Sequence, residues 1–127
     1  MPHLRIDYTA NLDPGAAMSG LCTTLAAAMA GMLDNAGAPL FPLHGTRVLA
    51  YPAPCHSVAD GGPGNAFVYM NLRITPGRSA DLVDRAGAAL LDVVRAHFEP
   101  MALGSALSVT LHIDEVKASY EGRYRPA

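Results

Sequence analysis

The residue with the clearest chemical potential in this chain is Pro2, which directly follows the initiator methionine. Removal of Met1 would leave a proline secondary amine at the start of residues 3–8, which alternate polar and apolar like a strand. The reference pKa of an α-amino group is about 7.7–8.0, so modest desolvation or a nearby cation would keep such an amine largely unprotonated near neutral pH. The sequence therefore offers a candidate general base held at a strand start.

A second reading of Pro2 stays open at this point. Proline is common at position two in chains that make no chemical use of it, and one motif is only a hypothesis. If Met1 is retained, the proline nitrogen is acylated and has no basic lone pair. The hypothesis of a catalytic proline is therefore conditional on removal of Met1.

Arginine supplies eight of the nine basic side chains, and its planar guanidinium suits carboxylates. A codon bias that also enriches alanine and glycine explains most of this excess, so only arginines in particular positions count. Arg47 lies at the start of a predicted strand, and Arg78 lies in a turn that leads into a predicted helix. Taken alone, Arg47 is better explained as a solvated strand residue, and Arg78 as a turn residue.

The first half of the chain predicts a strand, a helix and a strand. Alternation over residues 4–11 predicts the first strand, which a following Asp-Pro-Gly turn ends. Apolar residues at helical spacing predict an amphipathic helix of about twenty residues, with Ser19 as N-cap and Gly37 near its end. Residues 46–51 have the β-branched and aromatic content of a second strand, which Pro52 is expected to stop.

The second half repeats this order after a loop over residues 55–65. Residues 66–74 form a nearly continuous apolar run, typical of a central strand. Ser79 is a candidate N-cap for a second amphipathic helix, which extends to about Phe98. Residues 106–113 alternate as a last strand, and the tail beyond them is polar.

The pattern predicts an α+β fold in a single domain over residues 1–127. Two β-α-β units, residues 2–51 and 66–113, would place both helices on one face of a four-stranded mixed sheet. The other face would need a cover. Oligomerisation is the expected way to supply it.

The composition of the chain limits which binding partners and which cellular compartment we expect. The net charge is −2 without a basic block, and the longest apolar stretch, residues 21–33, is too short to cross a bilayer. We therefore expect neither nucleic acid nor membrane as partner. The first residues lack the pattern of a signal peptide, and Cys22 and Cys55 do not have a paired spacing, which together favour a cytoplasmic protein with reduced thiols.

No cofactor or metal is expected from the sequence. The five histidines show no metal-ligand spacing. The glycine-rich residues 61–64 precede a strand instead of opening a helix, so they predict a loop and not a phosphate cradle.

Several short segments of the chain resemble the 5-carboxymethyl-2-hydroxymuconate Δ-isomerases of the tautomerase superfamily. The resemblance spans residues 1–115 and rests on Met1-Pro2-His3, Phe41-Pro42-Leu43 followed by Gly45-Thr46-Arg47, Ala66-Phe67-Val68 with Met70, Gly77-Arg78-Ser79, and His97-Phe98. The elements around Arg47 and Arg78 are the more specific ones.

This resemblance implies a cofactor-independent isomerase that assembles as a homotrimer. Its reaction would be a 1,3-proton shift in a ring-cleavage product of homoprotocatechuate, within 4-hydroxyphenylacetate degradation. By residue-to-residue match, Pro2 would carry the proton, and Arg47 and Arg78 would bind the carboxylates of a di- or tricarboxylate substrate. Both arginines would also disfavour protonation of the amine.

The chain departs from the family pattern at several positions. Leu49 stands where relatives can place a basic residue, and the loop 52–65 and the tail 119–127 differ as well. Arg123 and Arg125 would reach a neighbouring subunit or belong to a mobile tail. Two alternatives remain: hydration or decarboxylation of a related acid, and a non-catalytic trimeric binding protein if Met1 is retained.

Overall fold

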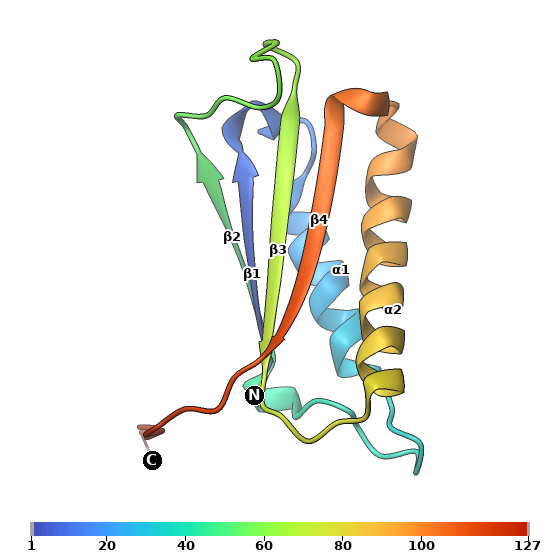
Figure 1. Cartoon of the computed structure of the whole chain (residues 1–127), viewed down its shortest axis with the longest axis vertical. Helices are drawn as coiled ribbons and strands as arrows, with labels where there is room; N and C mark the ends of the chain where they lie inside the picture. Colours follow the sequence, from blue (N-terminus) through green and yellow to red (C-terminus); the bar gives the residue numbers. More distant parts are fainter. Residues whose placement is uncertain (1, 127) are drawn as a thin grey trace.

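A four-stranded sheet with two helices on one face makes up the body of the protein (Figure 1). The computed structural model describes residues 2–126. The strands are β1 (His3–Thr9), β2 (Arg47–Ala53), β3 (Ala66–Ile74) and β4 (Leu107–Glu115), and the α-helices are α1 (Met18–Ala30) and α2 (Ala80–Phe98). The short 3-10 helices are η1 (Ala10–Leu12), η2 (Leu43–Gly45), η3 (Glu99–Met101) and η4 (Gly104–Ala106).

The connectivity confirms the repeat predicted from the sequence. β1 pairs parallel to β2 with α1 between them in the chain, and β3 pairs parallel to β4 with α2 between them. An antiparallel pairing of β1 with β3 joins the two units, which gives the order β2-β1-β3-β4. The mixed sheet is therefore as expected, and the apolar β3 lies in its interior.

The core lies between the sheet and the two helices. Alternate residues of the inner strands face it, and α1 and α2 each contribute a buried stripe at helical spacing. Its members include Leu4, Ile6, Val68, Met70 and Leu72 from the sheet, and Leu21, Leu25, Met29, Ala86, Leu90 and Val94 from the helices. Because strand side chains alternate, this burial fixes which residues occupy the other face.

The second helix begins where the sequence predicted. The Ser79 side chain accepts a hydrogen bond from Leu82 N at 3.3 Å, and Asp81 lies in the first turn, where the helix dipole favours an anion. No helix within residues 2–126 is long and apolar enough to cross a membrane.

The prediction for the first helix was wrong at both ends. The helix begins at the buried Met18, so Ser19 lies inside it and is not its N-cap. It ends at Ala30, 7 residues short of Gly37, and the chain then turns back because the Asp34 carboxylate accepts hydrogen bonds from the backbone N–H groups of residues 36 and 38. Glycine at position 31 weakens a helix by about 1 kcal/mol relative to alanine, and aspartate competes for the backbone in turns.

Two strand ends also differ from the expectation. β1 stops at Thr9, and η1 replaces its last predicted residues. β2 continues through Pro52 to Ala53, because β2 is an edge strand and an edge tolerates the missing proline N–H.

The loop between β2 and β3 is held by its own polar groups. Asp60 Oδ1 accepts hydrogen bonds from Gly62 N at 3.0 Å and from Asn65 Nδ2 at 2.8 Å, and these bonds lower the pKa of Asp60. Asn11 Nδ2 donates to the Asn65 carbonyl at 2.8 Å, which ties the loop to the end of β1. Cys55, in this loop, is exposed, and Cys22, in α1, is partly buried; both are free.

The sheet face away from the helices is polar. Asn71 Nδ2 donates to Asp114 at 2.7 Å, and Tyr69 Oη lies 2.8 Å from His112 Nδ1. Arg5 on the same face pairs with Asp7. This face is nevertheless mixed, since Leu49 and Tyr51 lie on it beside these polar groups.

We expect Tyr8→Phe to change how stability depends on pH. Burial, and then the 2.7 Å hydrogen bond from Tyr8 Oη to Asp13, raises the pKa of Tyr8 to about 12, above the value of 10.0 for an exposed tyrosine. The folded state thus holds this proton more tightly than the unfolded state, and its contribution to stability is full below pH 10 and is lost between pH 10 and 12.

Urea unfolding of both proteins from about pH 8 to about pH 11 measures this effect. At the lower end the variant should be less stable by about 1 kcal/mol, the usual value of one such hydrogen bond. The difference should shrink above about pH 10, where an exposed tyrosine ionises. A difference that stays constant over the whole range would contradict the assignment.

Candidate active site

Pro2 lies buried at one end of the sheet, directly before β1. Its carbonyl accepts a hydrogen bond from the backbone N–H of Arg47 at 3.2 Å. The parallel pairing of β1 with β2 produces this contact, since His3 and Arg47 are partners in register. Met1 lies outside the described residues, so the expectation that it is removed stays a prediction.

Arg47 is the first residue of β2, and its side chain is exposed. The turn before it is closed by Thr46 Oγ1, which donates to the Pro42 carbonyl at 3.0 Å, and Arg47 Nη1 lies 3.4 Å from the carbonyl of Gly45. Since Val48 packs against the core, the alternation of β2 directs Arg47 to the polar face of the sheet.

Arg78 is held on the opposite side, where the helices lie. Its guanidinium donates to the carbonyl of Thr75 at 3.0 Å and to that of Leu40 at 3.1 Å, and it lies 5.0 Å from the centroid of the Phe41 ring. Phe41 is almost fully buried, so Arg78 fastens the turn after β3 to a segment that belongs to the core. Of the five donors of a guanidinium, these contacts use two.

The three predicted residues therefore lie at the same end of the molecule. Figure 1 shows the N-terminus, the start of β2 and the turn between β3 and α2 at this end. Pro2 lies at the end of the inner strand β1, with Arg47 on the polar face and Arg78 on the helical face. The sequence named the residues, but the pairing of β1 with β2 places Arg47, and the contacts with Leu40 and Phe41 place Arg78.

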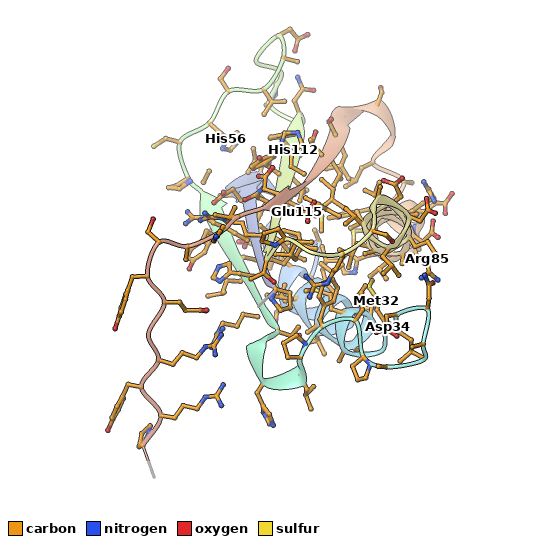
Figure 2. The ribbon with its side chains drawn as sticks, turned by 60° about the horizontal axis from the view of Figure 1, so that its bottom comes forward. Met32, Asp34, His56, Arg85, His112 and Glu115 are labelled. Atoms are coloured by element: carbon orange, nitrogen blue, oxygen red, sulfur yellow. The ribbon has the colours of Figure 1, made fainter. Side chains whose placement is uncertain are left out.

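A groove of about 820 Å³ runs over the polar face beside this end. Its walls are formed by His3, Arg5, Asn71, Arg73, Ile74, Thr75, Pro76, Val116, Lys117, Ala118 and Glu121. Figure 2 views this end of the protein, with Glu115 at the end of β4 and the tail leading away from the sheet. A second groove of about 560 Å³ lies at the opposite end, between α2 and β4, and is mostly apolar.

The basic residues of the first groove were missed by sequence reasoning. His3 and Arg73 are partners in the antiparallel pairing of β1 with β3. Each lies at a polar position in the alternating pattern of its own strand, and this alternation is visible in the sequence. That they lie side by side depends on a strand register that the sequence does not reveal.

Leu49 lies on the same polar face, opposite Arg5 in the register of β1 and β2. It offers no charge to a carboxylate. Arg5, its neighbour, is 3.3 Å from the Asp7 carboxylate and 4.5 Å from the centroid of the Tyr51 ring. The cation paired with Leu49 in the register is thus already engaged within the sheet.

The tandem β-α-β units, with Pro2 at the sheet end, form the tautomerase-like fold. Solved structures share this fold at low sequence identity. They include a fused 4-OT wild type symmetric trimer, with a TM-score of 0.63, 15% identity and coverage of 90% of this chain and 86% of that one.

The chain belongs to the 5-carboxymethyl-2-hydroxymuconate isomerase family, whose model matches residues 2–125. It is therefore an isomerase. A 5-carboxymethyl-2-hydroxymuconate Delta-isomerase of Escherichia coli is 28% identical over 116 residues, which is 91% of this chain and 87% of that protein.

Two solved structures of family members are also similar. The crystal structure of a 5-carboxymethyl-2-hydroxymuconate delta-isomerase has a TM-score of 0.91 and 38% identity, and the match covers 98% of this chain and 89% of that one. The structure of a 5-carboxymethyl-2-hydroxymuconate isomerase from Deinococcus radiodurans R1 has a TM-score of 0.82 and 29% identity, with 98% and 90% coverage.

Arg78→Ala should lower the stability of the protein as well as any activity. The substitution leaves the Leu40 carbonyl without its charged donor and removes the contact with Phe41, so we expect a loss of about 1–3 kcal/mol in the free energy of unfolding. Denaturant unfolding measures it. Arg95→Ala is the matched control, since its ion pair with Asp92 is exposed and should contribute less than about 1 kcal/mol. Equal stability of the two variants would contradict a fastening role for Arg78.

Proposed function

We propose that this isomerase shifts a proton in an unsaturated polycarboxylate, with the free amine of Pro2 as the proton carrier. The substrate proposed is 5-carboxymethyl-2-hydroxymuconate, in the degradation of homoprotocatechuate and 4-hydroxyphenylacetate. The observation that carries the proposal is the position of Pro2 at the sheet end, with an arginine on either side.

The neutral amine would remove a proton at one end of a three-atom unit and return it at the other end. One group thus serves as general base and then as general acid, which explains why the reaction needs no second titrating residue. The proton is conserved, and the double bond moves by one position. Between the two transfers the substrate carries an extra negative charge as a dienolate.

Arg47 and Arg78 would orient the substrate and stabilise that charge. Arg47 is exposed on the polar face, and Arg78 keeps donors beyond the two that bind carbonyls. Charge-assisted hydrogen bonds to carboxylates are short and strong, and they favour the more anionic transition state. Because Arg78 is already fixed by its carbonyl partners, little further ordering is needed when substrate binds.

A homotrimer would complete this site. Within one chain, the end that holds Pro2 is open along the polar face of the sheet, and the tail runs away from it (Figure 2). Three copies that turn this face toward one another would enclose the groove. The fused 4-OT protein, which shares this fold, is a symmetric trimer, and this likeness supports the same arrangement here.

Sedimentation equilibrium tests the assembly. We expect a mass three times the 13.3 kDa of the chain, independent of concentration in the micromolar range. A monomer at all concentrations would exclude a shared site.

The two N-terminal forms of the chain provide the sharpest test of Pro2. We expect protein that begins at Pro2, verified by intact mass, to isomerise the substrate, and protein that keeps Met1 to lose at least about 10²-fold in kcat because an amide nitrogen is not a base. Circular dichroism should show the same fold for both. Equal rates would exclude the amine as the proton carrier.

One observation favours an alternative reaction. Leu49 places an apolar side chain on the polar face beside Arg5, which changes the surface next to Arg47. Hydration or decarboxylation of a related acid would use the same amine and arginines. Following the products by NMR separates these reactions, because isomerisation alone conserves the composition of the substrate.

A further inference from the structure

We propose that Arg73 binds a third carboxylate of the substrate, in the groove of about 820 Å³ that His3, the residue after Pro2, helps to line. This inference rests on the proposed function and adds a specificity residue to it. The ligand it fits is an unsaturated tricarboxylate, whose extra carboxymethyl arm would lie along the polar face of the sheet.

The strand register places Arg73 in line with Arg47. His3 is the partner of Arg47 on β2 and of Arg73 on β3. All three residues lie at positions of their strands that face away from the core. Neighbouring strands are about 4.8 Å apart, so the backbones of Arg47 and Arg73 are roughly 10 Å apart. Two arginines whose backbones lie on either side of His3, the residue after Pro2, suit a substrate with carboxylates at more than one end.

Arg73 is also the groove arginine that is available to a ligand. Its exposed side chain makes no hydrogen bond or ion pair with any residue in the range 2–126. Its register partner on β4, Asp114, instead accepts a hydrogen bond from Asn71 at 2.7 Å. Arg5, in contrast, is occupied by Asp7 and Tyr51.

The composition of the groove fits a carboxylate ligand with an apolar carbon skeleton. Ile74, Pro76 and Val116 give it apolar walls, and its volume lies in the range of small-molecule sites. Lys117 adds a further cation from the tail, while the carboxylate of Glu121 is 2.9 Å from Arg123. The position of Val116 is fixed, because its N–H donates to the Ile74 carbonyl at 2.8 Å.

The substitution Arg73→Gln, in protein verified to begin at Pro2, tests this assignment with two substrates. For 5-carboxymethyl-2-hydroxymuconate, we expect kcat/KM to fall by roughly 10- to 100-fold, mainly through KM, as is typical of one lost charge-assisted hydrogen bond. For 2-hydroxymuconate, which lacks the carboxymethyl arm, we expect a change of less than about threefold. Arg73→Lys should recover part of the loss.

Arg95→Gln is the control for loss of one positive charge, since Arg95 lies on α2 and is paired with Asp92. It should leave both substrates unaffected. If Arg73→Gln lowers the two kcat/KM values equally, or changes neither, Arg73 does not read the third carboxylate. If the unsubstituted protein isomerises neither compound, the proposed function fails instead, and the two failures are thereby distinguished.

Discussion

The pairing of β1 with β2 on one side and β3 on the other is the constraint on which the rest of the structure depends. Leu4 and Ile6 are completely buried against the helices, so a slip of one residue would turn both toward solvent. The core therefore fixes the register. Because the register is fixed, His3 lies between Arg47 and Arg73, and the Pro2 carbonyl accepts a hydrogen bond from the backbone N–H of Arg47. Apolar burial on one face thus sets the position of the basic strand residues on the other.

The turn segments at the site end are fixed by polar contacts rather than by burial alone. Arg78 joins the turn after β3 to the Leu40 carbonyl, and Thr46 closes the turn before β2. These bonds hold backbone that belongs to neither α-helix nor strand. For the proposed function, the same guanidinium would be preorganised, since its position is determined before any substrate arrives. A structural role and a binding role for Arg78 are thus compatible.

Local sequence signals predicted elements well where one signal dominated. The apolar run of β3 and the Ser79 cap of α2 gave the bounds of both elements closely. The first helix was predicted too long, because its apolar residues continue past Gly31 while the turn around Asp34 has already begun. The site shows the same division. Pro2, Arg47 and Arg78 stood out in the sequence, but the contact of Arg78 with Leu40 spans 38 residues, and the place of Arg73 depends on an antiparallel register.

Charge is distributed unevenly at the end that holds Pro2, although the chain as a whole has a net charge of −2. Arg47 and Arg73 flank His3 on β2 and β3, whereas Asp114 and Glu115 lie on β4, the opposite edge strand. At this end the basic residues thus lie on β2 and β3, and the acidic residues on β4. Net composition hides this separation, because the strand order, and not the count of charges, decides which of them lie together.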